Sequence, residues 1–196
     1  PRPLEKDRCK AMAARLAQTL RSAAVRTGDA TIWIGRTFIA ADERAEQFAP
    51  IGKGYLSGTV GVALFLAVAA SVEPRESVRQ SLLTDVNDAL WWCDHLWRYE
   101  RILGRRDQPT DLGLAHGLGG TLYGLVAIGA VTGQHTLFDR AARIATWLQA
   151  ETITADRNYS LFGGAAGLAL GLAAVDAVRP GLLANQLDAC RALLLD

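Results

Sequence analysis

The sequence lacks an excess of charge of either sign. Its 21 lysine and arginine residues are balanced by 20 aspartate and glutamate residues, which leaves a formal net charge of +1. A protein that attracts nucleic acid or an anionic membrane through its whole-chain field needs a clear basic excess. We therefore expect no nucleic acid and no membrane among the partners of this chain.

Long uninterrupted apolar segments are also scarce. The longest nearly uncharged runs each contain several glycines or hydroxyl side chains and follow polar residues, whereas a bilayer span needs about 20 mostly apolar residues. The first ten residues, PRPLEKDRCK, are charged and contain no apolar core, so no secretory signal is visible. The expected location is cytoplasmic.

Cysteine and histidine are rare and scattered. The cysteines Cys9, Cys93 and Cys190 show no C-x-x-C spacing, which favours reduced thiols over a disulfide or zinc framework. The three histidines also lie far apart, and they are His95, His116 and His135. Because these residues provide no four-ligand cluster, we expect no tightly bound metal and no resident cofactor in this chain.

Glycine, by contrast, occurs 19 times and marks three similar places. Three apolar segments each open with two glycines three residues apart. These pairs are Gly58 and Gly61, Gly117 and Gly120, and Gly164 and Gly167. Repeats of about 40 to 50 residues, each with an apolar and an amphipathic segment, are typical of stacked helical hairpins. The sequence therefore predicts an all-α fold with three repeats in a single domain, residues 1–196.

The predicted helices are of two kinds. Apolar inner helices are expected to begin near Gly58, Gly117 and Gly164, and amphipathic outer helices are expected near residues 5–26, 77–102, 135–150 and 181–195. In the second outer helix Leu82 and Val86 recur at helical spacing, while Asp85 falls on another face. Between residues 28 and 55 glycine and proline interrupt this period, which predicts a connecting loop with one short helix and no sustained β-strand.

The paired glycines are interpreted as structural. Two glycines three apart lie on nearly one face of a helix, so the first turn can pack tightly on its neighbour. The same turn presents unpaired N–H groups, which favour negative groups at the mouth of whatever the inner helices surround.

Three segments resemble the first three repeats of the lanthionine synthetase C-like cyclase family. They are GYLSGTVGVALFLAVA (54–69), DLGLAHGLGGTLYGLVAIGAVTG (111–133) and YSLFGGAAGLALGLAAV (159–175). The similarity is strongest to the cyclase domain of the LanM-class, or type 2, lanthipeptide synthetases. Residues 33–52 are similar to the segment that leads into that domain.

This resemblance implies a fold and a reaction. Family members form an α/α toroid of seven helical hairpins, of which this chain would hold a partial ring. They bind zinc and add a cysteine thiol of a precursor peptide to a dehydrated serine or threonine, which closes a thioether (lanthionine) ring. Zinc favours the thiolate form of a coordinated thiol.

The chain departs from the family pattern at the site residues. The family's zinc ligands are a cysteine and a later Cys-His pair, and this chain has no Cys-His dipeptide, so we assign it no catalytic and no metal-binding residue. Ser160 stands where family members commonly carry an aspartate, and Asp156 either compensates or is a solvated loop residue. His116 lies in a similar His-Gly motif, but in the second repeat. His116 and Ser160 are therefore expected only to face substrate.

Several functions remain open from the sequence. The leading hypothesis is part of a lanthipeptide cyclase, and the second is a non-catalytic peptide-binding or scaffolding module with a partial toroid. An unrelated α/α-toroid glycosidase or terpene cyclase would need acidic clusters at the helix entrances, and a ring-forming membrane protein is the remaining option. Because a partial ring exposes an apolar flank, the expected partners are a precursor peptide and either the remaining repeats of the toroid or a second chain.

Overall fold

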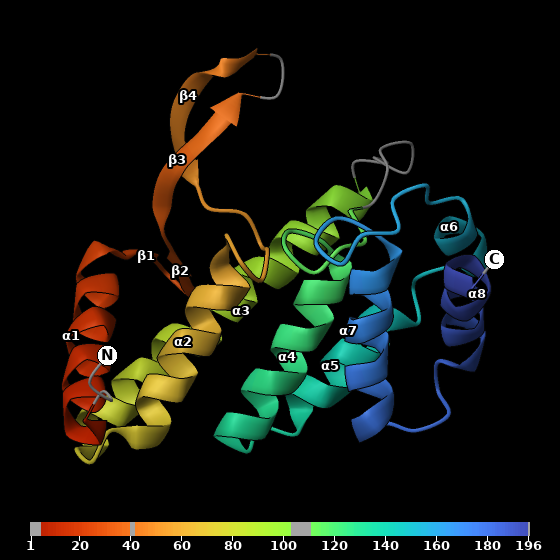
Figure 1. Cartoon of the computed structure of the whole chain (residues 1–196). Coiled ribbons are helices and arrows are strands. Elements are labelled where there is room, and N and C mark those ends of the chain that lie inside the picture. The colour runs from red at the N-terminus through yellow and green to blue at the C-terminus, as the bar shows by residue number, and fades with distance from the viewer. Residues whose placement is uncertain (1–4, 40–41, 103–110, 196) are drawn as a thin grey trace.

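The computed structural model describes residues 5–39, 42–102 and 111–195, and these are mostly helical (Figure 1). The helices are α1 (Lys6–Ala23), α2 (Thr59–Val72), α3 (Glu76–Ile102), α4 (Leu118–Thr132), α5 (Thr136–Ala145), α6 (Ala150–Thr154), α7 (Ala165–Val178) and α8 (Ala184–Leu195). The strands are β1 (Val25–Thr27), β2 (Ala30–Ile32), β3 (Ile34–Ile39) and β4 (Asp42–Pro50).

The apolar helices α2, α4 and α7 lie side by side and begin at the same end of the molecule (Figure 1). Each one starts at the residue after the first glycine of its pair, as the sequence predicts. Helices α2 and α4 contain no charged residue and α7 contains only Asp176, so they are apolar around most of their circumference. Such helices are stable when neighbours cover them on several sides.

The amphipathic helices complete three hairpins. Helix α3 packs on α2, α5 packs on α4, and α8 packs on α7. The main core lies between the two kinds of helix and includes the fully buried Leu66, Val86, Leu122, Leu168 and Leu172. Among the helices that the structure describes, none has both the length and the apolar character that a membrane crossing requires.

The third predicted outer helix is divided. Residues 135–150 were expected to form one helix, but α5 ends at Ala145 and α6 begins at Ala150. Leu148 in the intervening turn and Ile153 in α6 are both buried. The break therefore lets both side chains reach the core, which one straight helix would not achieve at this spacing.

The expectation of a connecting loop with a short helix over residues 28–55 is wrong. This segment takes part in two antiparallel hairpins, β1 with β2 and β3 with β4. Gly28 has a φ of +55° at the first turn, a conformation that favours glycine in a two-residue hairpin loop. Pro50 is the last residue of β4 and pairs with Ile34, the first residue of β3. The end of a strand tolerates the missing N–H of proline.

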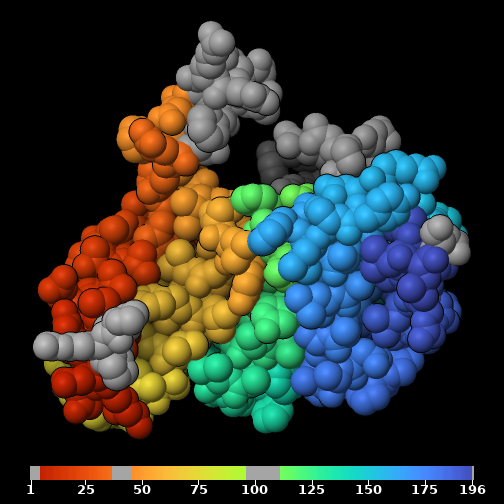
Figure 2. Space-filling model, in the orientation of Figure 1, coloured from red at the N-terminus to blue at the C-terminus, as the bar shows by residue number. Residues whose placement is uncertain are grey.

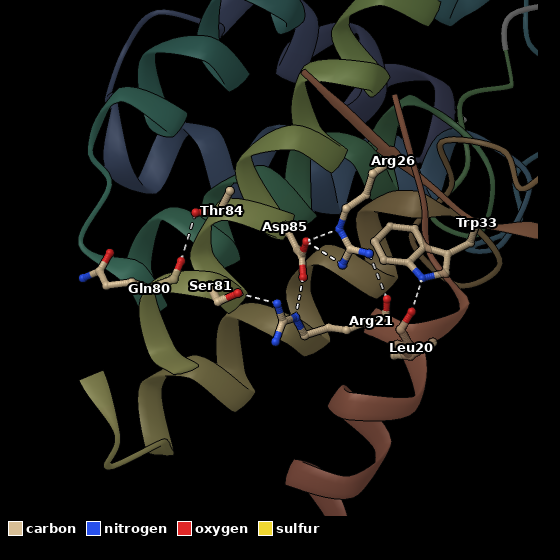
Figure 3. Close-up of polar contacts among 8 residues, drawn as sticks. All are labelled: Leu20, Arg21, Arg26, Trp33, Gln80, Ser81, Thr84 and Asp85. Atoms are coloured by element: carbon tan, nitrogen blue, oxygen red, sulfur yellow. Dashed lines mark hydrogen bonds and ion pairs between the residues drawn. The ribbon is translucent and has the colours of Figure 1, made fainter. Parts of the chain in front are cut away.

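Helix α1 and the first hairpin are fastened to α3 through one aspartate. Asp85 of α3 is 3% exposed and accepts hydrogen bonds from Arg21 of α1, at 2.6 Å, and from Arg26 of β1, at 2.8 and 3.1 Å (Figure 3). The second Arg21 branch donates to Ser81. Trp33, just after β2, is buried and its indole N–H donates to the Leu20 carbonyl at 2.8 Å. These contacts join the neighbouring α1 and first hairpin to each other and to α3, which lies about sixty residues later in the sequence.

Candidate functional site

Three short loops of the same construction lead into the apolar helices. We call residues 52–58, 111–117 and 158–164 the mouth loops. In each one, the residue after the first glycine of the pair donates its backbone N–H to the carbonyl oxygen of the residue seven positions earlier. These bonds join Thr59 to Gly52 at 2.7 Å, Leu118 to Asp111 at 2.8 Å and Ala165 to Asn158 at 2.8 Å. The repeat inferred from the glycine spacing is therefore also a repeat of hydrogen-bond geometry.

The paired glycines let each mouth loop lie directly on the first turn of its helix. A Cβ on either glycine of any pair would lie far inside van der Waals contact with the carbonyl oxygen six residues earlier. At Gly164, for example, that oxygen belongs to Asn158, and at Gly120 it belongs to Leu114. The first glycines have extended backbone angles that other residues also adopt, so the close approach of the loop is what requires glycine.

The close approach of neighbouring helices uses mainly other glycines than the sequence suggested. A Cβ on Gly119 of α4 would collide with the backbone of Gly167 on α7, and one on Gly171 would collide with Gly119. Between α2 and α4, a Cβ on Gly124 would collide with the side chain of Val60. The expectation that the glycine pairs let the first turn pack tightly on its neighbour is confirmed in part. A Cβ on Gly167 would also collide with the backbone of Leu114 in the second mouth loop, but all six paired glycines accommodate their own loops.

The mouth loops bond to one another along the end of the apolar layer. The N–H of Leu56 in the first loop donates to Ala115 in the second at 3.0 Å. The N–H groups of Leu114 and Ala115 donate in turn to Leu161 and Phe162 in the third, at 3.0 and 2.9 Å. In Figure 2 the light-blue third loop lies along the top of the helical body, beside the green second loop. The loops therefore form one continuous surface.

His116 joins the first two mouth loops through its side chain. Its Nδ1 atom lies 2.5 Å from Oγ of Ser57, and both residues are exposed. They occupy equivalent positions, each immediately before the first glycine of its repeat. An imidazole and a hydroxyl at this distance can share a proton or hold a polar group of a bound molecule between them.

Ser160 is exposed in the third mouth loop, and its polar groups are used within that loop. Its hydroxyl accepts the N–H of Gly163 at 3.1 Å, and its own N–H donates to Oδ1 of Asn158 at 3.0 Å. Asp156 accepts the N–H of Asn158 at 3.0 Å. No hydrogen bond between described residues joins Ser160 to His116 or to Asp156, so the two candidate residues stand on adjacent loops without direct contact.

A shallow cavity of about 490 Å³, largely open to solvent, adjoins the first mouth loop. It is lined by apolar side chains of α1 and α2, including Leu20, Val62 and Phe65, and by Tyr55, Leu56 and Ser57 of the loop. Burial, and secondarily the neighbouring Tyr123, raise the pKa of Tyr55, so its hydroxyl stays protonated at neutral pH. Sequence analysis did not identify this cavity, because its lining comes from segments that are not adjacent in the chain.

No known protein family has a model that matches this chain, and no curated protein matches it. A functional proposal therefore depends on the geometry of the mouth loops and on the resemblance in their motifs.

The described part of the chain brings together no group of three or more histidine, cysteine, aspartate or glutamate side chains that could hold a metal ion. Burial raises the pKa of the Cys93 thiol from 9.0 to about 12 and that of Cys190 to about 11. Both are buried, whereas Cys9 is exposed. The two buried thiols are therefore protonated at neutral pH and are not prepared to act as nucleophiles or metal ligands.

This difference predicts selective thiol labelling. At about pH 8 a thiol with a pKa near 12 is ionised in about one molecule in ten thousand, so an alkylating reagent should modify Cys9 alone in the folded chain. Peptide mapping by mass spectrometry after brief alkylation, with and without urea, measures this. The same pKa shifts also predict a pH dependence of stability. Above about pH 9 the two thiols ionise in the unfolded chain while burial keeps them protonated in the folded chain, so the free energy of unfolding should fall as the pH rises from about 9 toward 12. Rapid labelling of Cys93 without urea would contradict the prediction.

Proposed function

We propose that this chain is the opening part of a lanthipeptide cyclase domain, with three of the helical hairpins of an α/α toroid. The observation that carries the proposal is the threefold repeat of the mouth loops. Three apolar helices begin at one end, each under a loop of identical hydrogen-bond register, and the loops are bonded in sequence. These loops coincide with the three segments that resemble the family.

In this proposal the chain supplies surface for a precursor peptide. The mouth loops carry exposed apolar side chains, among them Leu56, Tyr159, Leu161 and Phe162, and the polar pair of Ser57 and His116. We assign no catalytic residue to the described residues. They also do not fit the zinc ion that the resemblance implies, because they hold no cluster of metal-ligating side chains, and no step through zinc is derived for them.

The test is ring closure by the natural polypeptide that contains this chain. The substrate is a peptide with one cysteine and one dehydroalanine. Addition of the S–H group across the C=C bond forms the S–C bond and moves the proton to the α-carbon, so the peptide mass stays constant while a free thiol disappears. We expect the fraction that reacts with N-ethylmaleimide to fall faster than in the spontaneous reaction. A matched peptide with alanine in place of dehydroalanine should keep its thiol.

The second candidate function is a peptide-binding or scaffolding module without catalysis. The exposed apolar residues of the mouth loops favour it independently of any chemistry. If the natural polypeptide binds the dehydrated peptide, and its thiol disappears no faster than without protein, the cyclase proposal is wrong and this alternative accounts for the surface.

A further inference from the structure

The hydroxyl of Ser57 and the imidazole of His116 meet between the first and second mouth loops. Oγ of Ser57 lies 2.5 Å from Nδ1 of His116, and within the described residues neither side chain makes another hydrogen bond. The main chains of the two loops are already joined, because the N–H of Leu56 donates to the carbonyl of Ala115 at 3.0 Å. The pair is therefore available for a role other than holding the loops together.

Both side chains are accessible and are attached to fixed backbone. Ser57 and His116 are exposed, and each directly follows one partner of the main-chain bond between Leu56 and Ala115. The N–H of Ala115 also donates to Phe162 of the third loop at 2.9 Å. Because these bonds fix the two attachment points relative to each other, the hydroxyl and the imidazole meet with little further loss of chain entropy.

Ser57 differs in this respect from two other exposed serines. The hydroxyl of Ser71 donates to the carbonyl of Val68 at 2.8 Å, and the hydroxyl of Ser160 accepts the N–H of Gly163 at 3.1 Å. Neither hydroxyl has an imidazole partner among the described residues. A serine hydroxyl is a weak nucleophile, and a base within hydrogen-bond reach activates it by taking its proton. Of these three serines only Ser57 has such a base.

The neutral imidazole of His116 can act as this base. When the ring proton is on Nε2, Nδ1 is an acceptor for the hydroxyl proton of Ser57. In the part of the chain that the structure describes, no carboxylate forms a hydrogen bond with the ring, so no third group orients it as in a complete catalytic triad. We therefore expect attack on activated esters, whose leaving groups depart readily, and not on amides.

We propose that Ser57 is a nucleophile with His116 as its general base, and that this pair hydrolyses activated esters. Oγ of Ser57 bonds to the carbonyl carbon, its proton passes to Nδ1 of His116, and the C–O bond to the leaving alcohol breaks as the alcohol takes that proton. Water then attacks the acyl-serine by the same route, which releases the carboxylic acid and restores Ser57. This reaction is separate from ring closure, for which we assign no catalytic residue.

Labelling with diisopropyl fluorophosphate tests the nucleophile in the natural polypeptide that contains this chain. Phosphorus bonds to Oγ of Ser57, the P–F bond breaks, and fluoride leaves as Nδ1 of His116 takes the hydroxyl proton. Peptide mapping by mass spectrometry follows the modification of each serine with time. We expect Ser57 to react at least about 100-fold faster than Ser71 and Ser160, which is the lower end of the gain from a positioned general base.

Two histidine variants test the base. His116→Gln keeps a polar side chain in the second loop but removes the base, so the labelling rate at Ser57 should fall about 100-fold. His135→Gln is the matched control, because His135 is also exposed and contacts the ring of Phe138 instead of a serine, and it should leave the rate unchanged. Far-ultraviolet circular dichroism checks that both variants fold. The comparison among serines in the unmodified polypeptide decides the question without them.

Hydrolysis of p-nitrophenyl acetate tests the acyl transfer itself. We expect Ser57→Ala and His116→Gln to slow the release of nitrophenolate by the same amount. Equal labelling of the three serines would overturn the inference, and so would equal labelling rates at Ser57 in the two histidine variants. Release of nitrophenolate that is unchanged in Ser57→Ala would also overturn it, by assigning the reaction to the imidazole of His116 alone. Because ring closure is measured on a different substrate, either proposal can fail while the other stands.

Discussion

Replacing Gly164 by alanine is expected to destabilise the fold by about 3 kcal/mol or more, the upper range for overpacking a well-packed site. The added methyl group would collide with the carbonyl oxygen of Asn158, and that oxygen is fixed because it accepts the N–H of Ala165. Because the methyl group is attached to the helix backbone and the oxygen belongs to the loop backbone, the collision cannot be relieved by moving a flexible side chain. Urea unfolding followed by far-ultraviolet circular dichroism measures the loss.

Gly52→Ala is the matched control for this prediction. Gly52 also lies in a mouth loop and its carbonyl makes the equivalent hydrogen bond, but a Cβ there has nothing within 4 Å. We expect a change within about 0.5 kcal/mol, and alanine slightly favours folding at such a position by restricting the unfolded chain. Equal stability of the two variants would show that the third loop lifts off its helix at little cost.

The starts of the apolar helices could be predicted because the signal is local. The apolar segments of α2, α4 and α7 each follow a glycine pair, and helical periodicity separates them from the amphipathic segments. The register of the mouth loops was also present in the sequence. Gly54, Gly58 and Gly61 have the same spacing as Gly113, Gly117 and Gly120. The role of the first glycine of each triplet becomes clear only in the structure, because a Cβ there would collide with the next mouth loop.

The hairpins could not be predicted from periodicity. Trp33 and Thr31 are buried while Ile34 and Phe48 are exposed, so apolar residues lie on both the covered and the open positions. Strand prediction depends on a contrast between the two faces, and neither hairpin has it: β2 packs on α3, whereas β3 and β4 project from the helical body (Figure 1). Gly35 and Pro50, interpreted as breaks, are tolerated because these strands have open edges.

Long-range ion pairs could not be predicted from the sequence either. Asp85 was placed on a polar face of an amphipathic helix, and by periodicity alone that face should be solvated. The structure buries it, because Arg21 and Arg26, about sixty residues earlier, converge on it. Ion pairing over such a separation leaves no periodic pattern to detect. The fastening of the amino-terminal segment to α3 thus became visible only in three dimensions (Figure 3).

Asp85→Ala should destabilise the chain by about 3 kcal/mol, at the lower end for breaking a buried ion pair. The carboxylate side chain is 4% exposed, while those of Arg21 and Arg26 are 26% and 43% exposed, so water will partly compensate the two arginines. Loss of their common acceptor should also free α1 and β1 first, seen as faster amide exchange there than in α4. The control is Asp139→Ala, which removes an aspartate whose ion pair with Arg179 is largely exposed, and only a small shift in the urea midpoint is expected. Equal shifts for both variants would mean that the Asp85 cluster does not hold the amino-terminal segment in place.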